Sequence, residues 1–140
     1  VLDESSPNKF KKKTQIIDSG ITNELFNREL YSYFGKVEKK DYILITNFHE
    51  KKANRVVKNN QVAEKVDYEL TAKYELFYKN FSCKVFEKSI ITKFSFAPKS
   101  SGYNFGTDRS FEKLYRNSIK KNIEIFLNDT PTEMNCIKWK

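Results

Sequence analysis

The sequence is poor in the residues on which most catalytic and metal sites depend. It has a single histidine, His49, and its two cysteines, Cys83 and Cys136, lack the CxxC spacing typical of zinc sites. Its four glycines form neither a Gly-x-Gly-x-x-Gly run nor a P-loop, the two recognisable phosphate cradles. No Gly-x-Ser-x-Gly motif supplies a serine nucleophile. We therefore expect no metal, no cofactor and no enzymatic activity.

Long hydrophobic runs are also lacking. Aliphatic runs such as Ile43 to Ile45 stop at three residues, whereas a membrane-spanning helix needs about 20 apolar residues. The chain begins at Val1 without an initiator methionine or an apolar leader, so we expect a processed or trimmed form. Apolar residues still make up 39% and aromatic residues 15% of the 140 residues. This composition predicts one folded domain rather than a disordered chain.

Acidic residues are outnumbered, and the basic excess gathers at predicted loops. The chain has 26 Lys and Arg against 18 Asp and Glu, a net charge of +8, which favours an anionic partner, although solubility alone explains it equally well. Arg55 and Lys58 flank the first predicted hairpin, and Lys99 and Arg109 bracket the loop before the last helix. If both loops lie at one end of a sheet, they form a basic tip able to grip phosphates or sugar acids.

Hydrophobic periodicity predicts two helices. Apolar residues recur at spacings of three and four over 23–34, where Asn23 is placed to cap the helix and Gly35 to end it. A second apolar stripe runs over 108–128, and Pro131 prevents its continuation.

Four further segments have the patterns of strands, and together with the helices they predict the fold. They cover 14–17, 41–48 running toward 55–57, 66–78 and 81–96. The third alternates apolar and polar residues with the period of two that a half-buried strand needs. The resulting order is β-α-β-β-β-α. It predicts an α+β two-layer sandwich, with a four-stranded, mostly antiparallel sheet and two helices packed on one face.

The domain boundaries and the isolated polar residues have ordinary explanations. We expect a flexible leader over 1–13, a domain over 14–130 and a tail over 131–140. Cys83 falls in a predicted strand, where a cysteine is usually a small buried hydrophobe, so unpaired thiols are favoured over a disulfide. His49 is expected at the surface or at an edge.

The run Val57 to Glu64, followed directly by the alternating strand, resembles the hairpin of the LptE family of lipopolysaccharide-assembly lipoproteins. The run Tyr103-Asn104-Phe105 before the last helix is similar to the family's Tyr-Asn element. The resemblance covers roughly 16–128, by pattern more than by identity.

Membership of this family implies a location and a role. It implies a lipid anchor ahead of Val1 in the inner leaflet of the outer membrane, with the domain facing the periplasm. It implies a non-enzymatic plug that helps assemble an LptD-like β-barrel and binds lipopolysaccharide for delivery to the outer leaflet.

The resemblance also places a candidate lipopolysaccharide site. The family's basic residue before the hairpin turn falls on Lys58, for which simple solvation of a turn is the alternative explanation. The lysine position before the last helix falls near Thr107, a departure that leaves Arg109 as the substitute. Arg55 and Lys99 are weaker additions.

Two alternative functions stay open at this point. A small basic nucleic-acid-binding domain would set the loop aromatics Tyr103 and Phe105 among these charges, although no RNP-like segment is present. A purely structural plug would bind the barrel and no ligand of its own. The family resemblance favours barrel and lipopolysaccharide as partners and no nucleic acid.

Overall fold

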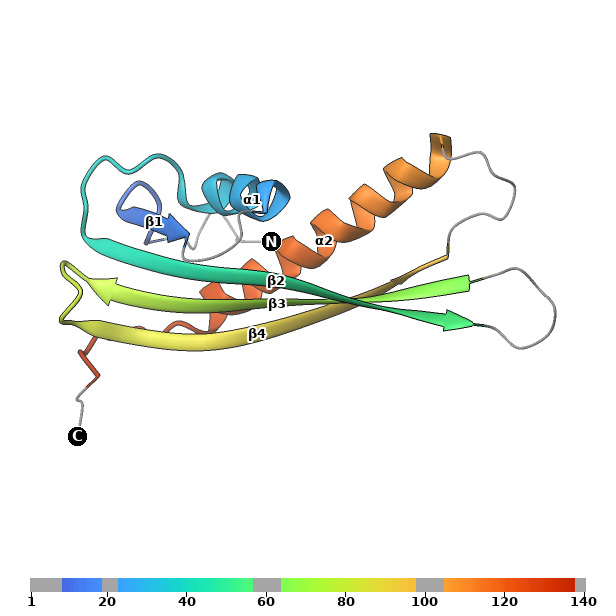
Figure 1. Cartoon of the computed structure of the whole chain (residues 1–140). Helices are drawn as coiled ribbons and strands as arrows, with labels where there is room; N and C mark the ends of the chain where they lie inside the picture. The colour runs from blue at the N-terminus through green and yellow to red at the C-terminus, as the bar shows by residue number, and fades with distance from the viewer. Residues whose placement is uncertain (1–8, 19–22, 57–63, 98–104, 138–140) are drawn as a thin grey trace.

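The computed structural model describes residues 9–18, 23–56, 64–97 and 105–137, with side chains for 9–18, 23–53, 65–97 and 110–137. Figure 1 shows a long, twisted sheet with the helices on one side of it. The elements in chain order are β1 (Thr14–Asp18), α1 (Glu24–Phe34), β2 (Tyr42–Val56), β3 (Glu64–Tyr78), β4 (Lys84–Phe96) and α2 (Phe105–Asp129). This order confirms the predicted β-α-β-β-β-α fold.

The four strands lie in the sheet in their sequence order. Strands β2, β3 and β4 are antiparallel neighbours, whereas the short β1 pairs in parallel with β2. The pairing of β2 with β3 is unbroken from Tyr42 opposite Tyr78 to Val56 opposite Glu64. Because β1 reaches only to the level of Thr46, the rest of β2 forms an edge. His49 lies on that edge and is exposed, as expected.

Helix α1 begins and ends at the residues that the sequence predicts. The Asn23 side-chain oxygen accepts a hydrogen bond from the backbone N–H of Phe26 at 3.0 Å, which satisfies one of the free donors of the first turn. Gly35 follows the last turn at φ +68°, a conformation that other residues rarely adopt, and its N–H donates to the Tyr31 carbonyl.

Tyr74 shows that both helices cover the same face of the sheet. Its ring stacks on Phe126 of α2 with centroids 4.3 Å apart and lies 6.3 Å from the ring of Phe26 in α1. The helix-facing residues of β3 are fully buried, as the period of two predicts: Leu70, Ala72, Tyr74 and Leu76. The two-layer arrangement is therefore confirmed.

Helix α2 packs on the sheet through a polar residue that the apolar stripe did not include. Asn122 is 0% exposed, accepts a hydrogen bond from the Tyr74 hydroxyl at 2.7 Å, and donates to the Ile90 carbonyl at 3.0 Å. Leu114, which the stripe did include, is 38% exposed. Hydrogen bonding thus allows a polar side chain to occupy a core position that the pattern assigns to apolar ones.

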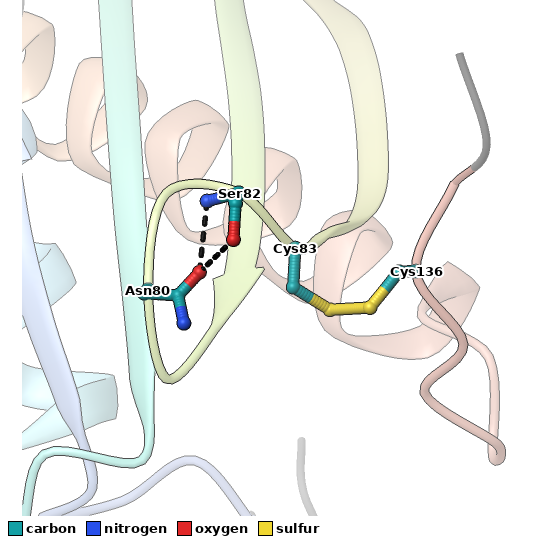
Figure 2. The surroundings of a disulfide bond; sticks show 4 residues. All are labelled: Asn80, Ser82, Cys83 and Cys136. Atoms are coloured by element: carbon teal, nitrogen blue, oxygen red, sulfur yellow. Dashed lines mark hydrogen bonds between the residues drawn. A yellow bond between two sulfur atoms is a disulfide. The ribbon is translucent and has the colours of Figure 1, made fainter.

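The prediction of unpaired thiols was wrong, because Cys83 and Cys136 form a disulfide with 4.9 Å between their Cα atoms. Figure 2 shows that Cys83 belongs to the β3–β4 turn, which ends later than the sequence pattern suggests. The chain after α2 folds back to this turn, where the Ile137 N–H donates to the Lys84 carbonyl at 2.6 Å. The start of the predicted tail is therefore held against the domain.

Part of the predicted leader is also packed. Phe10 is 2% exposed, and its ring lies 4.9 Å from that of Tyr42 and 6.2 Å from that of Phe34. Residues 9–13 thus belong to the packed domain, while 1–8 lie outside the described residues.

Candidate functional site at the tip of the sheet

Both predicted basic loops connect elements at one end of the sheet, here called the tip. The pairing of Arg55 with Lys65 places the end of β2 beside the start of β3, and the pairing of Val66 with Phe96 adds the end of β4. Helix α2 starts at the same end, since the Phe111 ring lies 5.3 Å from that of Phe96. The described elements that flank the two predicted basic loops therefore end or begin at the same end of the sheet (Figure 1).

The four predicted ligand-binding residues are only partly described. The backbone of Arg55 lies near the end of β2, where it pairs with Lys65 of β3, and that of Arg109 lies near the start of α2. The side chains of both arginines lie outside the described residues. Lys58 and Lys99 lie wholly outside the described residues. Contact of these residues with lipopolysaccharide stays a prediction.

Aromatic side chains converge at the tip from three elements. The rings of Tyr68 in β3 and Phe94 in β4 stack 4.9 Å apart, and Phe111 of α2 lies 5.0 Å from Tyr68. Phe96 completes this set, called the tip aromatic cluster, and all four side chains are only half-buried. The cluster gives the tip a partly exposed apolar surface, which suits the apolar part of a ligand.

In the sequence these four aromatics belong to the apolar faces of their elements, and no motif connects them with a site. Their position was the signal that could have connected them with a site. Each lies at the end of its strand or helix that is nearest to a predicted basic loop.

A buried, hydrogen-bonded tyrosine, Tyr115, packs against the tip aromatic cluster on its buried side. Tyr115 is 3% exposed and lies 5.6 Å from Phe111, ring to ring. Its hydroxyl donates to Glu50 at 2.7 Å and accepts from the Asn23 side-chain amide at 3.2 Å. Burial, reinforced by the hydrogen bond to Glu50, raises the pKa of Tyr115 well above its ordinary value. The hydroxyl thus stays a neutral donor that ties α1, β2 and α2 together.

A surface depression of about 450 Å³ lies near the tip, on the face of the sheet that the helices leave open. Its lining includes Tyr68 and Phe94, the apolar Ala53, and charged or polar residues of three strands: Lys51, Asp67, Glu69, Lys93 and Ser95. Asp67 accepts a hydrogen bond from Ser95 at 2.6 Å, and Glu69 stands opposite Lys51 on one side and Lys93 on the other. Both carboxylates thus lie opposite polar or basic residues of neighbouring strands, the ordinary arrangement of charges on an exposed sheet face.

The described part of the chain has neither a metal-binding cluster nor a membrane-spanning helix. No three His, Cys, Asp or Glu side chains there are grouped so as to hold a metal ion. None of its helices is long and apolar enough to cross a bilayer.

Comparison with known proteins finds similarity in structure alone. No family model matches the sequence, and no curated protein matches it. A Caulobacter crescentus protein assigned to the lipoproteins superposes with a TM-score of 0.60 at 9% identity, covering 85% of this chain and 88% of that one. This chain shares the fold of that protein.

Two further lipoproteins have the same fold. Rare lipoprotein B of Shewanella oneidensis superposes with a TM-score of 0.57 at 12% identity, covering 83% of this chain and 91% of that one. A minor lipoprotein of Acinetobacter baumannii has a TM-score of 0.54 at 12% identity, covering 85% and 90%. At such low identity the similarity establishes the fold, and the function has to be argued from the site.

Proposed function

We propose that the protein is a non-enzymatic assembly lipoprotein of the LptE type, anchored at the periplasmic face of the outer membrane. In this role it plugs an LptD-like β-barrel, helps the barrel to assemble, and binds lipopolysaccharide at the tip for delivery to the outer leaflet. The observation that carries the proposal is the half-buried aromatic cluster, which lies at the end of the sheet where β2, β3, β4 and α2 bring in the predicted basic segments, on a fold shared with bacterial lipoproteins.

The chemistry of lipopolysaccharide matches this tip in both of its parts. Its phosphates and inner-core sugar acids call for cations, for which we propose four residues at the tip: Arg55 of β2, Arg109 of α2, and Lys58 and Lys99 between the elements. Its acyl chains call for apolar surface, which the tip aromatic cluster supplies. A nucleic-acid reader would also use cations and aromatics, so the two functions are separated by experiment.

The first experiment titrates the purified chain with fluorescent lipopolysaccharide, and separately with a single-stranded oligonucleotide, at physiological salt. We expect saturable binding to lipopolysaccharide. The double variant Lys58→Glu with Arg109→Glu should bind at least tenfold more weakly, since each charge-assisted contact contributes about 1.5–3 kcal/mol and about 1.4 kcal/mol is tenfold.

A matched control separates the tip from the overall charge. Lys113→Glu with Lys120→Glu makes the same change of charge on exposed residues of α2, and it should leave the affinity within about twofold. Equal losses in the two double variants would reject a site at the tip. Preferred binding to the oligonucleotide, with a steep salt dependence, would reject the proposal in favour of a nucleic-acid-binding domain.

The second experiment tests the barrel. The chain is co-expressed with the LptD-like barrel of the same organism, and the tagged barrel is purified from the membrane fraction. We expect the chain to co-purify and to raise the yield of folded barrel. Barrel binding without any binding of lipopolysaccharide would leave a purely structural plug.

A further inference from the structure

Three chain segments meet at the end of the sheet opposite the tip, and they carry a concentration of lysines. They are residues 11–13 before β1, residues 35–41 between α1 and β2, and residues 79–83 in the β3–β4 turn. Figure 1 shows these connections side by side at the left end of the molecule. The surface they form is called the basal face.

Backbone hydrogen bonds hold the three segments together. The carbonyl of Lys12 accepts from the N–H of Glu38 at 2.8 Å, and that of Lys13 accepts from the N–H of Asp41 at 3.0 Å. The carbonyl of Asp41 in turn accepts from the N–H of Lys79 at 2.8 Å. The lysines of all three segments are therefore held on one surface of the folded domain.

The charge of the basal face is strongly unbalanced. Its seven exposed lysines are Lys11, Lys12, Lys13, Lys36, Lys39, Lys40 and Lys79. The same segments contain two carboxylates, Glu38 and Asp41. Glu38 lies 3.9 Å from Lys12 in an ion pair that is largely exposed on both sides, so it is screened by solvent and neutralises little.

Apolar side chains project among these lysines. Phe81 is 57% exposed at the β3–β4 turn, where its ring rests edge-on against Phe77 at 5.6 Å, and Val37 is 39% exposed. Exposed aromatic and aliphatic residues among lysines are typical of surfaces that lie in the headgroup region of a bilayer.

The type of cation decides what such a surface fits. All seven cations are lysines, whose ammonium groups act as hydrated point charges and lack the planar fork by which arginine grips a single phosphate. Lysines spread over three segments suit a broad anionic plane, to which each basic residue near the surface adds attraction. We propose that the basal face docks on the surface of a bilayer that contains anionic phospholipids.

This docking goes beyond the proposed function, because it concerns phospholipid headgroups and the end of the molecule opposite the lipopolysaccharide site. The chain enters the described domain at Lys9, directly before the first basal segment. An anchor on the N-terminal side would therefore bring the basal face toward the membrane, although the docking itself needs no anchor.

The test measures sedimentation of the full chain, without any lipid anchor, on vesicles of phosphatidylcholine containing about a third phosphatidylglycerol. The test variant changes four basal lysines to glutamine: Lys11→Gln, Lys36→Gln, Lys39→Gln and Lys40→Gln. The control variant removes the same charge elsewhere on the exposed surface: Lys73→Gln, Lys93→Gln, Lys113→Gln and Lys120→Gln. Circular dichroism confirms folding, and if the fourfold test variant does not fold, two double variants replace it.

We expect the natural chain to bind the anionic vesicles, to leave pure phosphatidylcholine vesicles unbound, and to lose most binding at about 0.5 M salt. The test variant should bind at least tenfold more weakly and the control variant within about twofold of the natural chain. Phe81→Ser should remove the binding that persists at high salt.

Absence of binding to the anionic vesicles, or equal losses in the test and control variants, would overturn the docking. The lipopolysaccharide titration is run on the same proteins, so failure of the basal face and failure of the tip are separate results.

Discussion

Asn122 links the packing of α2 to the sheet through directional bonds. Its amide reaches the Ile90 carbonyl at 3.0 Å, and a second contact between helix and sheet lies beside it, where the Ser118 hydroxyl donates to Thr92 at 2.9 Å. Tyr74, also buried, donates to the Asn122 oxygen. Apolar packing alone tolerates small shifts of a helix, whereas a satisfied buried network holds α2 at one position along β3 and β4.

The substitution Asn122→Leu should destabilise the domain by about 2–3 kcal/mol, because the Tyr74 hydroxyl and the Ile90 carbonyl lose a buried partner. Urea denaturation measures this change. The double variant Asn122→Leu with Tyr74→Phe also removes the Tyr74 hydroxyl, which would otherwise lack an acceptor. The stability that the double variant loses should therefore be smaller than the sum of the losses in the two single variants. Additive losses would contradict a shared network.

Buried tyrosines should make the fold sensitive to alkali. Burial raises the pKa values of Tyr74, Tyr33 and Tyr115 above the ordinary value of 10.0, and hydrogen bonds to carboxylates raise those of the last two further. The unfolded chain ionises at lower pH than the folded one. Their stabilisation is therefore complete below about pH 10 and is lost as the pH rises through the folded pKa values.

We therefore expect the melting temperature to fall steadily above about pH 10. Tyrosinate absorbance should show part of the tyrosines titrating only as the protein unfolds. Tyr115→Phe, which removes one such group, should reduce the slope of this fall, and an unchanged slope would contradict the assignment. Substitution of the exposed Tyr31 is the control.

At the scale of elements, the disulfide joins the β3–β4 turn to the chain that follows α2. It closes a loop over a sequence separation of 53 residues. Loop-closure entropy in the unfolded chain then predicts about 4 kcal/mol of stabilisation. Such bonds persist in oxidising compartments, of which the proposed periplasmic location is one.

Cys83→Ser with Cys136→Ser should lower the free energy of unfolding by about 2–4 kcal/mol in urea titrations. The reduced natural chain should match this variant, and reductant should leave the variant unchanged, which controls for effects of the serine substitutions. A loss below about 1 kcal/mol would contradict a role of the bond in stability.

The elements themselves could be predicted because their signals are local. Asn23 and Gly35 bound α1 through their own side chain and backbone, and the alternation in β3 follows directly from one buried face. The parallel pairing of β1 and the disulfide depend on how distant segments meet. Two isolated cysteines carry no spacing signal, so the sequence argument preferred the commoner buried thiol.

The same distinction applies to the surfaces. The topology predicts that the two basic loops lie at one end of the sheet, because every second connection of an antiparallel meander lies at the same end. The tip aromatic cluster and the basal face each combine side chains from three segments far apart in the chain. Their members look like ordinary core aromatics and solvated lysines until the fold assembles them.

At the scale of the whole molecule, the two proposed surfaces lie at opposite ends of the sheet. Strands β2 and β3 have 15 residues each, which at about 3.3 Å per residue corresponds to about 50 Å. The Debye length at physiological salt is about 8 Å. Charges at one end are therefore screened from ligands at the other, so each end should bind its ligand independently.

This independence is tested by exchanging the two assays. The tip variant Lys58→Glu with Arg109→Glu and the fourfold basal variant both lower the net charge of +8 by four units. Their overall charge is equal, so any difference reports where the charge was removed. The tip variant should lose lipopolysaccharide binding and keep vesicle binding, and the basal variant should do the reverse.

In the combined variant, the loss of binding free energy in each assay should equal the sum of the losses of the two separate variants in that assay, to within about 0.5 kcal/mol, as expected for sites farther apart than about 10 Å. Parallel losses in both assays would mean that net charge alone drives binding, and both surfaces would then be rejected as sites.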